Sequence, residues 1–452
     1  MKSYSQYTPV SLGWVDKLPA HWKTARLKQL LFERKENNNP IKTKEILSLT
    51  NTRGVIPYAE KGNIGNKSKE KLEDYHLAYP DDLILNSMNV IIGSVGVSRY
   101  FGAISPVYYA LVSRGELNIK YSEYIFRLST FEKTLEGLGN GILDIRKRIP
   151  MIKLNNVILP VPPRPEQDQI VRFLDWKVSS INRLINIKRA EIKRLEELKL
   201  SRLFTIVTQG LNEKVELIDS GIEHIGLIPS HWKVLLNHRI YKENCRSFSG
   251  DETVLSLSQK DGLLPYVEMK ERSLHTASYE NWKLVLPNDL VLNRFKAHLG
   301  VFFSSNYRGI VTFHYGVYEP IMKVSSKYYE VLFHTSKYKQ VFAGASNGMT
   351  VGLQNLSNTN FYKVYTVYPP YEEQCAIVAE VQKIENEMQA IISTISKEIG
   401  ILHEFKTRLI SDVVTGKIDV RDIEIPEYEF VEETENVEAD SEGAAEEELE
   451  DE

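Results

Sequence analysis

The sequence predicts an α+β protein made of two tandem copies of one unit, in which an α/β domain precedes a long helix. Three observations lead to this prediction. Short strings return about 207 residues later, short apolar runs fill the first part of each copy, and helical apolar spacing fills the last part. A chain of 452 residues is long enough for two to four domains.

The repeated strings keep their order and their spacing along the chain. They are LPAHWK (18–23) and IPSHWK (228–233), KEN (35–37) and KEN (242–244), LSLTNTRGVIPYAE (47–60) and LSLSQKDGLLPYVE (255–268), YPDDLILN (79–86) and LPNDLVLN (286–293), and VPPRPEQ (161–167) and YPPYEEQ (368–374). A solenoid repeat is only 20–50 residues long. The longer period here therefore indicates a whole globular unit with its connecting element.

Residues 41–163 and 248–370 carry short apolar or alternating runs between Gly, Pro and Asn residues. Such runs are typical of strands joined by loops, and YSEYIFRLSTFEKTLEGL (121–138) indicates short helices among them. The predicted segments are a first domain at 1–163, a first long helix at 164–211, a second domain at 212–370, a second long helix at 371–416 and an acidic tail at 417–452.

The helical segments follow a proline pair in each copy. Their apolar stripes are Ile170, Leu174, Val178, Ile181, Ile185, Ile192 and Leu195, and Ile377, Val381, Ile384, Met388, Ile391, Ile395, Ile399, Leu402 and Leu409. Steps of three and four over several heptads indicate a coiled-coil seam. We expect the two helices to pair antiparallel in a pseudo-two-fold arrangement, which would place the domains at opposite ends of a helical bar. The alternative is that each helix packs on its own domain.

Composition bounds the class of protein. No run of 18 or more apolar residues indicates a membrane span, and the N-terminal segment has no apolar stretch typical of a signal peptide. Cys245 and Cys375 are too few for a disulfide framework or a structural zinc site, so we expect plain thiols in a cytoplasmic protein.

The net charge of −4 conceals two differently charged parts. The segment after Arg421 holds 16 acidic residues and no basic one; without it, 44 acidic residues face 56 basic ones, a net charge of +12. An acidic segment poor in aromatic residues is typical of disorder. A basic body suits a polyanion such as DNA, although a merely lysine-rich soluble surface is the alternative.

The motifs of nucleotide and metal chemistry are missing. The sequence has no phosphate-binding P-loop, no H-E-x-x-H string and no C-x-x-C pair. GLGNG (137–141) loses its glycine pattern in the second copy, and YPPY (368–371) lacks the polar first residue found in amino-methyltransferases. We therefore expect no catalytic, cofactor-binding or metal-binding residue, and a protein that binds without catalysing.

The repeated P-x-H-W-K, D-L-I-L-N or D-L-V-L-N, and PPRPEQ or PPYEEQ strings resemble the DNA-specificity subunit of type I restriction-modification systems. The resemblance covers roughly residues 10–420, and the acidic tail departs from it. It implies a non-catalytic subunit with two target recognition domains, each reading one half of an asymmetric bipartite DNA sequence. It also implies two adenine-methyltransferase subunits held by the helices, which bind S-adenosylmethionine, and restriction subunits that use ATP and Mg where they are present.

Base reading requires polar side chains on loops that can enter a groove of DNA. The candidates in the first domain are Asn51, Thr52, Arg53, Asn86, Ser87, Asn89, Ser94, Arg146, Lys147 and Arg148. The candidates in the second domain are Gln259, Lys260, Asn293, Arg294, Lys296, His298, Asn347, Gln354 and Asn355. Asn86 and Asn293 occupy repeated positions, so a scaffold role is their alternative. For each of the others the alternative is a solvated surface group.

Two further functions remain open from sequence. The two domains could be protein-recognition modules of a scaffold that bridges two protein partners. An enzyme fused to such domains is disfavoured by the missing motifs. Sequence-specific, salt-dependent DNA binding in complex with a methyltransferase would distinguish a DNA-specificity subunit from both the scaffold and the fused enzyme.

Overall fold

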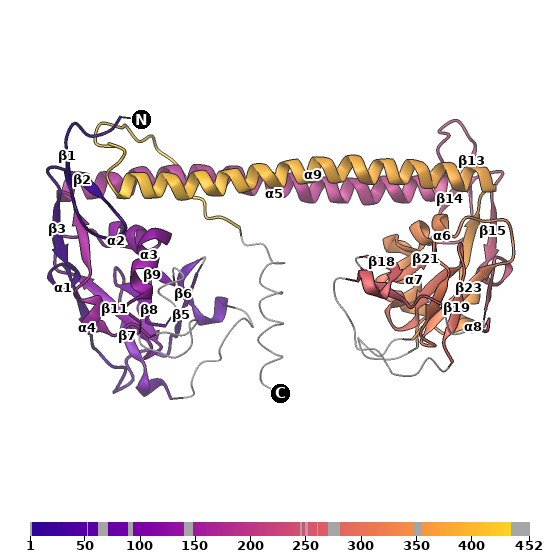
Figure 1. Ribbon diagram of the computed structural model, residues 1–452, viewed down its shortest axis with the longest axis horizontal. Helices are drawn as coiled ribbons and strands as arrows, with labels where there is room; N and C mark the ends of the chain where they lie inside the picture. Colours follow the sequence, from indigo (N-terminus) through magenta and orange to yellow (C-terminus); the bar gives the residue numbers. More distant parts are fainter. Residues whose placement is uncertain are drawn as a thin grey trace. The chain divides into compact units, whose positions relative to one another are not determined.

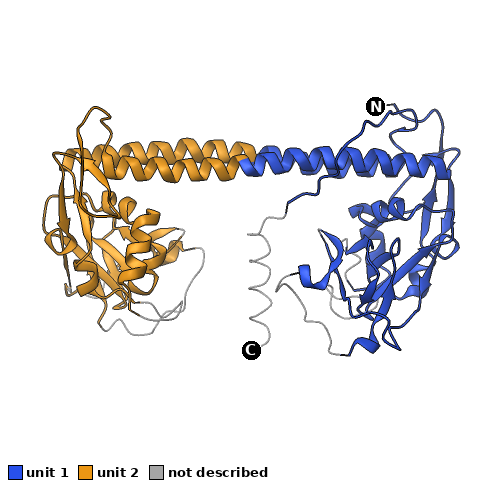
Figure 2. Cartoon of the chain, turned by 180° about the vertical axis from the view of Figure 1, so that it is seen from behind, with its two compact units in different colours: residues 1–190, 396–452 blue, residues 191–395 orange. Residues whose placement is uncertain are grey.

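Each copy of the repeat contributes to its own unit. In the computed structural model, unit 1 comprises residues 1–190 and 396–452, and unit 2 comprises residues 191–395 (Figure 2). The structure describes residues 2–51, 53–61, 71–88, 94–139, 148–244, 246–248, 252–259, 261–269, 281–347 and 355–434.

A four-stranded antiparallel sheet lies at the centre of each unit, with the same strand order in both (Figure 1). In unit 1 the order is β4 (Leu31–Arg34), β11 (Tyr108–Ser113), β8 (Leu83–Asn86) and β9 (Val95–Val97). In unit 2 it is β16 (Tyr241–Glu243), β23 (Tyr315–Pro320), β20 (Leu290–Asn293) and β21 (Phe302–Ser304).

Among the described residues, four two-stranded pairs accompany this sheet in each unit, and they also correspond. Unit 1 has β1 (Tyr7–Pro9) with β2 (Lys17–Pro19), β3 (Lys23–Arg26) with β12 (Ile158–Val161), β5 (Leu47–Thr50) with β6 (Gly54–Pro57), and β7 (His76–Ala78) with β10 (Gly102–Ile104). Unit 2 has β13 (Leu217–Asp219) with β14 (Leu227–Pro229), β15 (Lys233–Leu236) with β24 (Tyr365–Tyr368), β17 (Leu255–Ser258) with β18 (Gly262–Pro265), and β19 (Lys283–Val285) with β22 (Gly309–Val311).

The repeated D-L-[IV]-L-N string forms the strand that divides two cores. Successive side chains of a strand point to opposite faces. Leu83 and Leu85 of β8 therefore enter the core that includes the long helices, whereas Ile84 enters a smaller core beneath the β5–β6 hairpin. In unit 2, Leu290 and Leu292 of β20 enter the core that includes the long helices, whereas Val291 enters the smaller core. The string repeats because both faces of the strand must be filled.

Short helices cover one side of the sheet. The helical segment expected at 121–138 is two helices, α2 (Ile119–Phe126) and α3 (Ser129–Glu136), which break at Arg127 and Leu128. The counterparts in unit 2 are α6 (Ser326–Phe333) and α7 (Ser336–Ala345). The remaining short helices are α1 (Leu27–Leu30), α4 (Met151–Leu154) and α8 (Asn358–Tyr362).

The two long helices are α5 (Arg164–Gln209) and α9 (Tyr371–Val414), which lie side by side (Figure 1). In unit 1 the start of α5, with Ile170 and Leu174, shares a core with Leu409 and Val413 near the end of α9. In unit 2 the end of α5 shares a core with the start of α9. The pairing is therefore antiparallel, as expected, and buries each apolar stripe against the other helix.

One residue of the expected stripe is misassigned. Ile391 is 46% exposed, whereas Ile384 and Ile395 on either side of it are buried. The neighbouring Ile392 is more covered than Ile391, so the buried stripe shifts by one residue at this level. Alternating steps of three and four only approximate the 3.6-residue turn of a helix, which permits such a shift.

The first turn of α5 explains the P-x-H-W-K string. The buried carboxylate of Glu166 accepts hydrogen bonds from Trp22 Nε1 at 2.9 Å and from the Tyr4 hydroxyl at 2.6 Å, and it lies 2.7 Å from His21 Nε2. An acidic residue is also favoured at the positive N-terminal end of a helix. Burial, followed by the Glu166 carboxylate, raises the pKa of Tyr4, which keeps its hydroxyl a donor.

Unit 2 repeats this contact in a more exposed form. Trp232 Nε1 donates to Glu373 at 2.9 Å, and His231 Nε2 lies 2.7 Å from the same carboxylate, whose side chain is 40% exposed. The adjacent glutamines are also equivalent, since Gln167 and Gln374 each donate to a proline carbonyl at 2.8 Å. The PPRPEQ and PPYEEQ strings thus fasten each long helix to its own domain.

A glycine ends each long helix against the tryptophan of a domain. Gly210 and Gly416 have φ angles of +79° and +72°, in the left-handed region that favours glycine. A Cβ atom on Gly210 would lie 3.2 Å from the Trp232 ring, and one on Gly416 would lie 3.0 Å from the Trp22 ring. Each glycine therefore lies directly after the last turns of its long helix.

The chain after α9 differs from the disorder expected for 417–452. The amide of Asp419 donates to the carbonyl of Lys2 at 2.9 Å, and Ile423 and Ile425 pack against the core of unit 1. Residues 429–434 continue along α5. Acid-rich composition indicates disorder only where nothing binds the segment, and here side chains of α5 bind its backbone. Residues 435–452 lie outside the described residues.

Other expectations concern single groups. Cys375 is a free, exposed thiol, whereas Cys245 lies outside the described residues. Among the helices that the structure describes, none is long and apolar enough to cross a membrane. Within the same residues, no cluster of three or more His, Cys, Asp or Glu side chains could hold a metal ion.

We predict that Glu166→Ala lowers the free energy of unfolding by about 3 kcal/mol, because it leaves buried donors on Tyr4 and Trp22 without an acceptor. The matched variant Glu373→Ala should cost about 1 kcal/mol, since the Glu373 side chain is 40% exposed and solvent reaches its partner His231. Urea unfolding followed by circular dichroism measures both. Equal losses would show that burial of the carboxylate does not decide the strength of this contact.

Candidate nucleic-acid interface

Described residues that flank the predicted base-reading loops of unit 1 lie at one edge of the central sheet. Strand β8 ends at Asn86, and the carbonyl of the next residue, Ser87, accepts the amide of Ile149 at 2.9 Å. Ser87 and Ile149, which stand next to the candidate segments in the sequence, therefore lie side by side at the end of this strand. In unit 2 the carbonyl of Arg294 accepts the amide of Leu356 at 3.0 Å in the same way.

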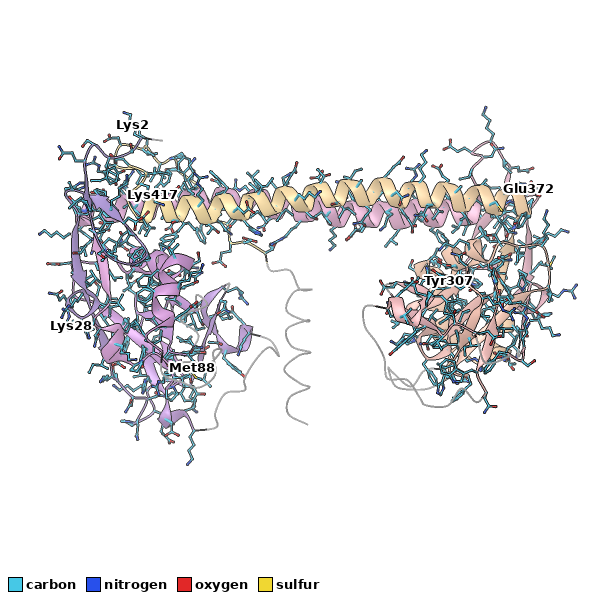
Figure 3. The ribbon with its side chains drawn as sticks, in the orientation of Figure 1. Lys2, Lys28, Met88, Tyr307, Glu372 and Lys417 are labelled. Atoms are coloured by element: carbon cyan, nitrogen blue, oxygen red, sulfur yellow. The ribbon has the colours of Figure 1, made fainter. Side chains whose placement is uncertain are left out.

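The β5–β6 hairpin lies at the same edge. The backbones of Gly54 and Gly96 approach so closely that a Cβ on Gly96 would lie 3.0 Å from the Gly54 Cα atom. The hairpin turn, with Asn51 and Arg53, is thereby held next to β9. Within unit 1, Met88 at this edge lies on the side away from the end of α9, where Lys417 lies (Figure 3).

The structure separates the unit 1 candidates into two groups. Asn51, Arg53 and Arg148 are exposed, and Arg53 donates to the Glu60 carboxylate at 3.1 Å. Ser87 and Ser94 are buried, at 1% and 2% exposure, so neither reaches solvent. The Ser87 hydroxyl donates to the Val107 carbonyl at 2.6 Å, which assigns it to the scaffold. The other candidates lie outside the described residues, namely Thr52, Asn89, Arg146 and Lys147.

The repeated asparagines shape the turn after the strand. Asn86 Oδ1 accepts the amide of Met88 at 3.1 Å, and Asn293 Oδ1 accepts the amide of Phe295 at 3.1 Å. Asparagine side chains commonly accept from the backbone two residues on, which fixes the turn. The side-chain oxygens of Asn86 and Asn293 are thus both engaged by the backbone of the turn that follows their strand.

The unit 2 candidates on the same edge differ in exposure. Gln259 and Lys296 are exposed. Asn347 and Asn355 are exposed and exchange backbone hydrogen bonds of 3.0 and 2.8 Å, which join the two ends of segment 348–354. His298 is half-buried, and its Nδ1 atom is buried without a partner. Lys260 and Gln354 lie outside the described residues.

Arg294 belongs to an internal ion cluster. Its Nη2 atom donates to Glu243 Oε1 at 2.5 Å and to Asn358 Oδ1 at 2.8 Å. Lys283 Nζ donates to the same Glu243 oxygen at 2.9 Å. The guanidinium therefore neutralises a largely buried carboxylate and is not free to bind a base, whereas Lys296 two residues later is exposed.

Arg127 is a further residue at this edge that the sequence did not indicate. Arg127 follows α2, and its Nη2 atom donates to the carbonyl of Val95 in β9 at 2.8 Å, next to Gly54. The equivalent residue of unit 2, His334, contacts Phe303 of β21, and burial lowers its pKa so that the neutral ring is favoured. The only sequence signal for this position was the end of a helix.

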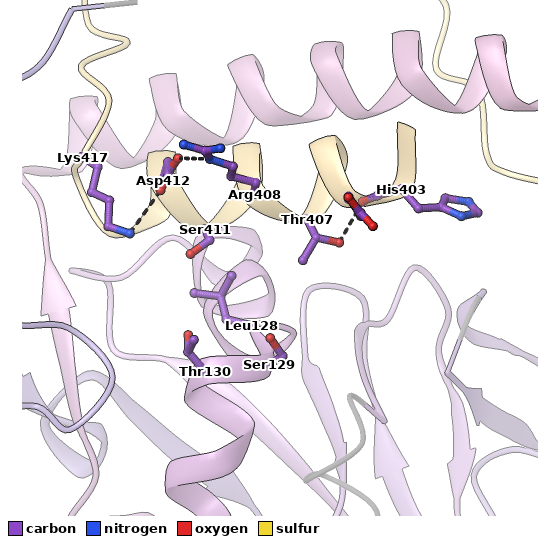
Figure 4. A pocket seen from close by; sticks show the side chains of 10 residues that line it. Leu128, Ser129, Thr130, His403, Thr407, Arg408, Ser411, Asp412 and Lys417 are labelled. Carbon is purple, nitrogen blue, oxygen red and sulfur yellow. Dashed lines mark hydrogen bonds and ion pairs between the residues drawn. The ribbon is translucent and has the colours of Figure 1, made fainter. Parts of the chain in front are cut away.

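A pocket of about 750 Å³ lies elsewhere in unit 1, between α9 and the start of α3 (Figure 4). Two of its cations, Arg408 and Lys417, both pair with Asp412, at 3.5 and 3.1 Å. These pairs leave little uncompensated charge for a ligand. We call the edge of each sheet with the exposed candidate residues the loop edge; these residues are Asn51, Arg53 and Arg148 in unit 1 and Gln259 and Lys296 in unit 2. The loop edge is therefore the better candidate for binding a polyanion.

We predict that Arg294→Ala lowers the free energy of unfolding by about 2 kcal/mol, because Glu243 loses one of its cations while it stays largely buried. Lys296→Ala should change it by less than about 0.5 kcal/mol, as an exposed substitution usually does. Urea titration of both variants checks this. A stable Arg294→Ala protein would return Arg294 to the group of free base-reading candidates.

Comparisons with known proteins agree with this architecture. Residues 19–195 match the family model of the type I restriction modification DNA specificity domain. A chain from a structural study of complex assembly and conformational transition of the type I R-M system is similar in fold, with a TM-score of 0.63 and 12% identity over 89% of this chain and 99% of that chain. No curated protein matches the chain in sequence.

A second solved structure, the HsdS subunit from Thermoanaerobacter tengcongensis, gives a TM-score of 0.51 and 12% identity over 89% of this chain and 98% of that chain. At this identity the likeness shows the fold. The resemblance seen in the sequence is thereby confirmed: residues 19–195 match the type I restriction modification DNA specificity domain, and the chain shares the fold of an HsdS subunit.

Proposed function

We propose that this protein is the sequence-specific DNA-recognition subunit of a type I restriction-modification complex, in which each unit reads one half of a bipartite asymmetric target. One observation carries the proposal. Both units have the same strand order and the same turn-forming asparagines, yet the exposed side chains at the loop edge differ. A common scaffold with different exposed groups is what two different half-targets require.

The exposed side chains have the chemistry of base and phosphate contacts. Arg53 and Arg148 in unit 1 and Lys296 in unit 2 are cations at this edge, and Gln259 is an amide that can pair with a base edge. Cations that neutralise phosphates make affinity fall with salt, whereas amides and arginines in the major groove select bases. Scaffold residues such as Ser87 and Arg294 then hold the loops without touching DNA.

The chain is proposed to act without catalysis and without a cofactor of its own. In this proposal the methyl donor S-adenosylmethionine binds to two partner adenine-methyltransferase subunits, and ATP with Mg binds to restriction subunits where they are present. The sequence supports this division of labour because it has no phosphate-binding loop and no metal-binding string.

We predict that replacing residues 41–163 by the equivalent domain of another specificity subunit changes one half of the methylated target and spares the other. The reason is that each unit has its own sheet, cores and loop edge. Mapping of methylated adenines in DNA that was modified by the complex measures the outcome. A simultaneous change in both halves would contradict the assignment of one half-target to each unit.

A second prediction concerns the isolated chain. We expect it to transfer no methyl group to DNA, and to support methylation only when an adenine methyltransferase is added. Incorporation of labelled methyl groups into target DNA measures this, with the methyltransferase alone as the control. Methylation by the isolated chain would overturn the proposal, and protein-bridging without any DNA binding would favour a scaffold instead.

A further inference from the structure

A C-terminal strap, residues 429–434, binds a polar stripe on α5 of unit 1. The stripe begins with Ser179 and Asn182, which lie on one face of the helix. Ser179 Oγ donates to the carbonyl of Glu429 at 3.0 Å and accepts the amide of Val431 at 2.8 Å. Asn182 Nδ2 donates to the carbonyl of Val431 at 3.1 Å. The strap is therefore recognised through its backbone.

The same pattern continues one turn further along α5. Asn186 Nδ2 donates to the carbonyl of Glu432 at 2.9 Å, and its Oδ1 atom accepts the amide of Thr434 at 3.0 Å. Arg189 donates to the carbonyl of Thr434. Four side chains, separated by three successive steps of three or four residues, thus bind one segment.

A cluster of basic side chains fixes the strap at Glu433. Arg189 Nη2 donates to its carboxylate at 2.7 Å, His403 Nε2 lies 2.7 Å from it, and Lys406 pairs with its other oxygen. Burial alone would raise the pKa of Glu433, but the hydrogen bonds from Lys406 and His403 lower it to about 2. The carboxylate therefore stays ionised and holds cations from both long helices.

Two further arginines pair with the strap. Arg183 of α5 lies 3.8 Å from the Glu429 carboxylate. Arg99, which follows β9, lies 3.5 Å from the Glu432 carboxylate, and its guanidinium lies 5.9 Å from the centre of the Phe430 ring. The strap thus contacts α5, α9 and the strand-rich part of unit 1.

The second copy of the repeat lacks this set of cations. A spacing of 207 residues aligns Gln167 with Gln374 and gives the counterpart of each basic residue that contacts the strap. Only one of these five counterparts is itself basic. Arg99, Arg183, Arg189, His403 and Lys406 correspond to Asn306, Ala390, Ser396, Glu196 and Lys199. The cationic face of unit 1 is therefore not part of the common scaffold.

Exposure of the polar stripe differs between the units in the same sense. Ser179 and Asn182 under the strap are 2% and 6% exposed. Their counterparts on α9 of unit 2, Asn386 and Gln389, are both exposed. In unit 2 the chain after α5 instead enters the β13–β14 pair. Equivalent helix faces are thus covered in unit 1 and open in unit 2.

We propose that the strap is a built-in competitor for a protein-docking face on the long helices of unit 1, and that an adenine-methyltransferase subunit displaces it. The partner would then bind unit 1 more weakly than unit 2. This inference rests on the proposed function for the identity of the partner. The face itself is defined by the strap contacts of Ser179, Asn182, Asn186, Arg189, His403 and Lys406.

The contacts favour a protein over DNA as the displacing partner. Most of the α5 groups bind successive carbonyls and amides of a peptide backbone, a pattern that another polypeptide segment can present. Exposed apolar side chains also lie on the unit 1 portions of both helices, namely Leu184 and Ile187 on α5 and Ile401 and Phe405 on α9. A partner surface that presents a carboxylate within an apolar border matches this combination.

The test compares three forms of the full chain: intact, ending at Thr434, and ending at Tyr428. Titration calorimetry with the cognate adenine-methyltransferase subunit gives the affinity of each binding event. In the intact chain the weaker of the two binding events is the one at unit 1. We expect this event to become about tenfold tighter in the form ending at Tyr428, which is the size of an ordinary coupling between sites. The form ending at Thr434 keeps the strap while it loses the following acids, so it should behave as the intact chain.

Glu433→Gln should reproduce most of this gain in the intact chain. The matched control is Glu427→Gln, which removes one charge at an exposed position before the strap. Unchanged or weaker methyltransferase binding by the form ending at Tyr428 would overturn the proposal. If the form ending at Tyr428 instead binds DNA more tightly, in a salt-sensitive way, and binds the methyltransferase no better, the covered face binds nucleic acid and the proposal is wrong.

A measurement without a partner tests the closed state separately. The amides of Val431 and Thr434 should exchange with deuterium more slowly than in the free peptide 426–434, and Glu433→Gln should accelerate both. Exchange as fast as in the free peptide would show that the strap does not cover the face. Failure of the methyltransferase to bind any form, with slow exchange intact, would contradict the proposed function and with it the choice of partner.

Discussion

The structure depends on the burial of two long apolar stripes, one on α5 and one on α9. Neither helix can expose a stripe of that length to water, so each covers the other antiparallel. This pairing obliges each unit to combine distant parts of the chain, since unit 1 takes the start of α5 and the end of α9. The carboxylates Glu166 and Glu373 then tie the first turn of each helix to the histidine and tryptophan of its own domain.

Repetition and divergence have separate physical causes in this chain. Repeated residues serve contacts that every copy needs, such as the aspartates Asp82 and Asp289. Each of them pairs with an arginine, Arg34 or Arg246, that comes from a different position of its copy. Each of these aspartates also accepts a backbone amide of the preceding turn, from Tyr79 and from Leu286. Residues that differ between copies lie at the loop edge and under the strap. At these places the contacts of the fold do not require a particular residue type, whereas a binding partner can require one.

Sequence alone located the long helices closely, because apolar periodicity and a helix-ending glycine are local signals. It could not separate Arg294 from Lys296, since both are cations in one turn and only Arg294 meets Glu243, about fifty residues away in the chain. Ser87 and Ser94 were misassigned for a similar reason, because burial depends on long-range packing. The strap escaped because its recognition uses backbone carbonyls, and its cations extend from Arg99 to Lys406 along the sequence.

Charge distribution, and not net charge, decides where this protein can bind a polyanion. The acidic end of the chain makes the formal total nearly neutral, but its strap carboxylates neutralise a defined set of cations on the helices of unit 1. Ion pairs act over short distances, because salt screens exposed charges beyond about 10 Å. The exposed cations of the loop edge, such as Arg148 and Lys296, are not part of this set. In the proposed function, the tail would close one basic face while the loop edge keeps the charge that phosphate contacts require.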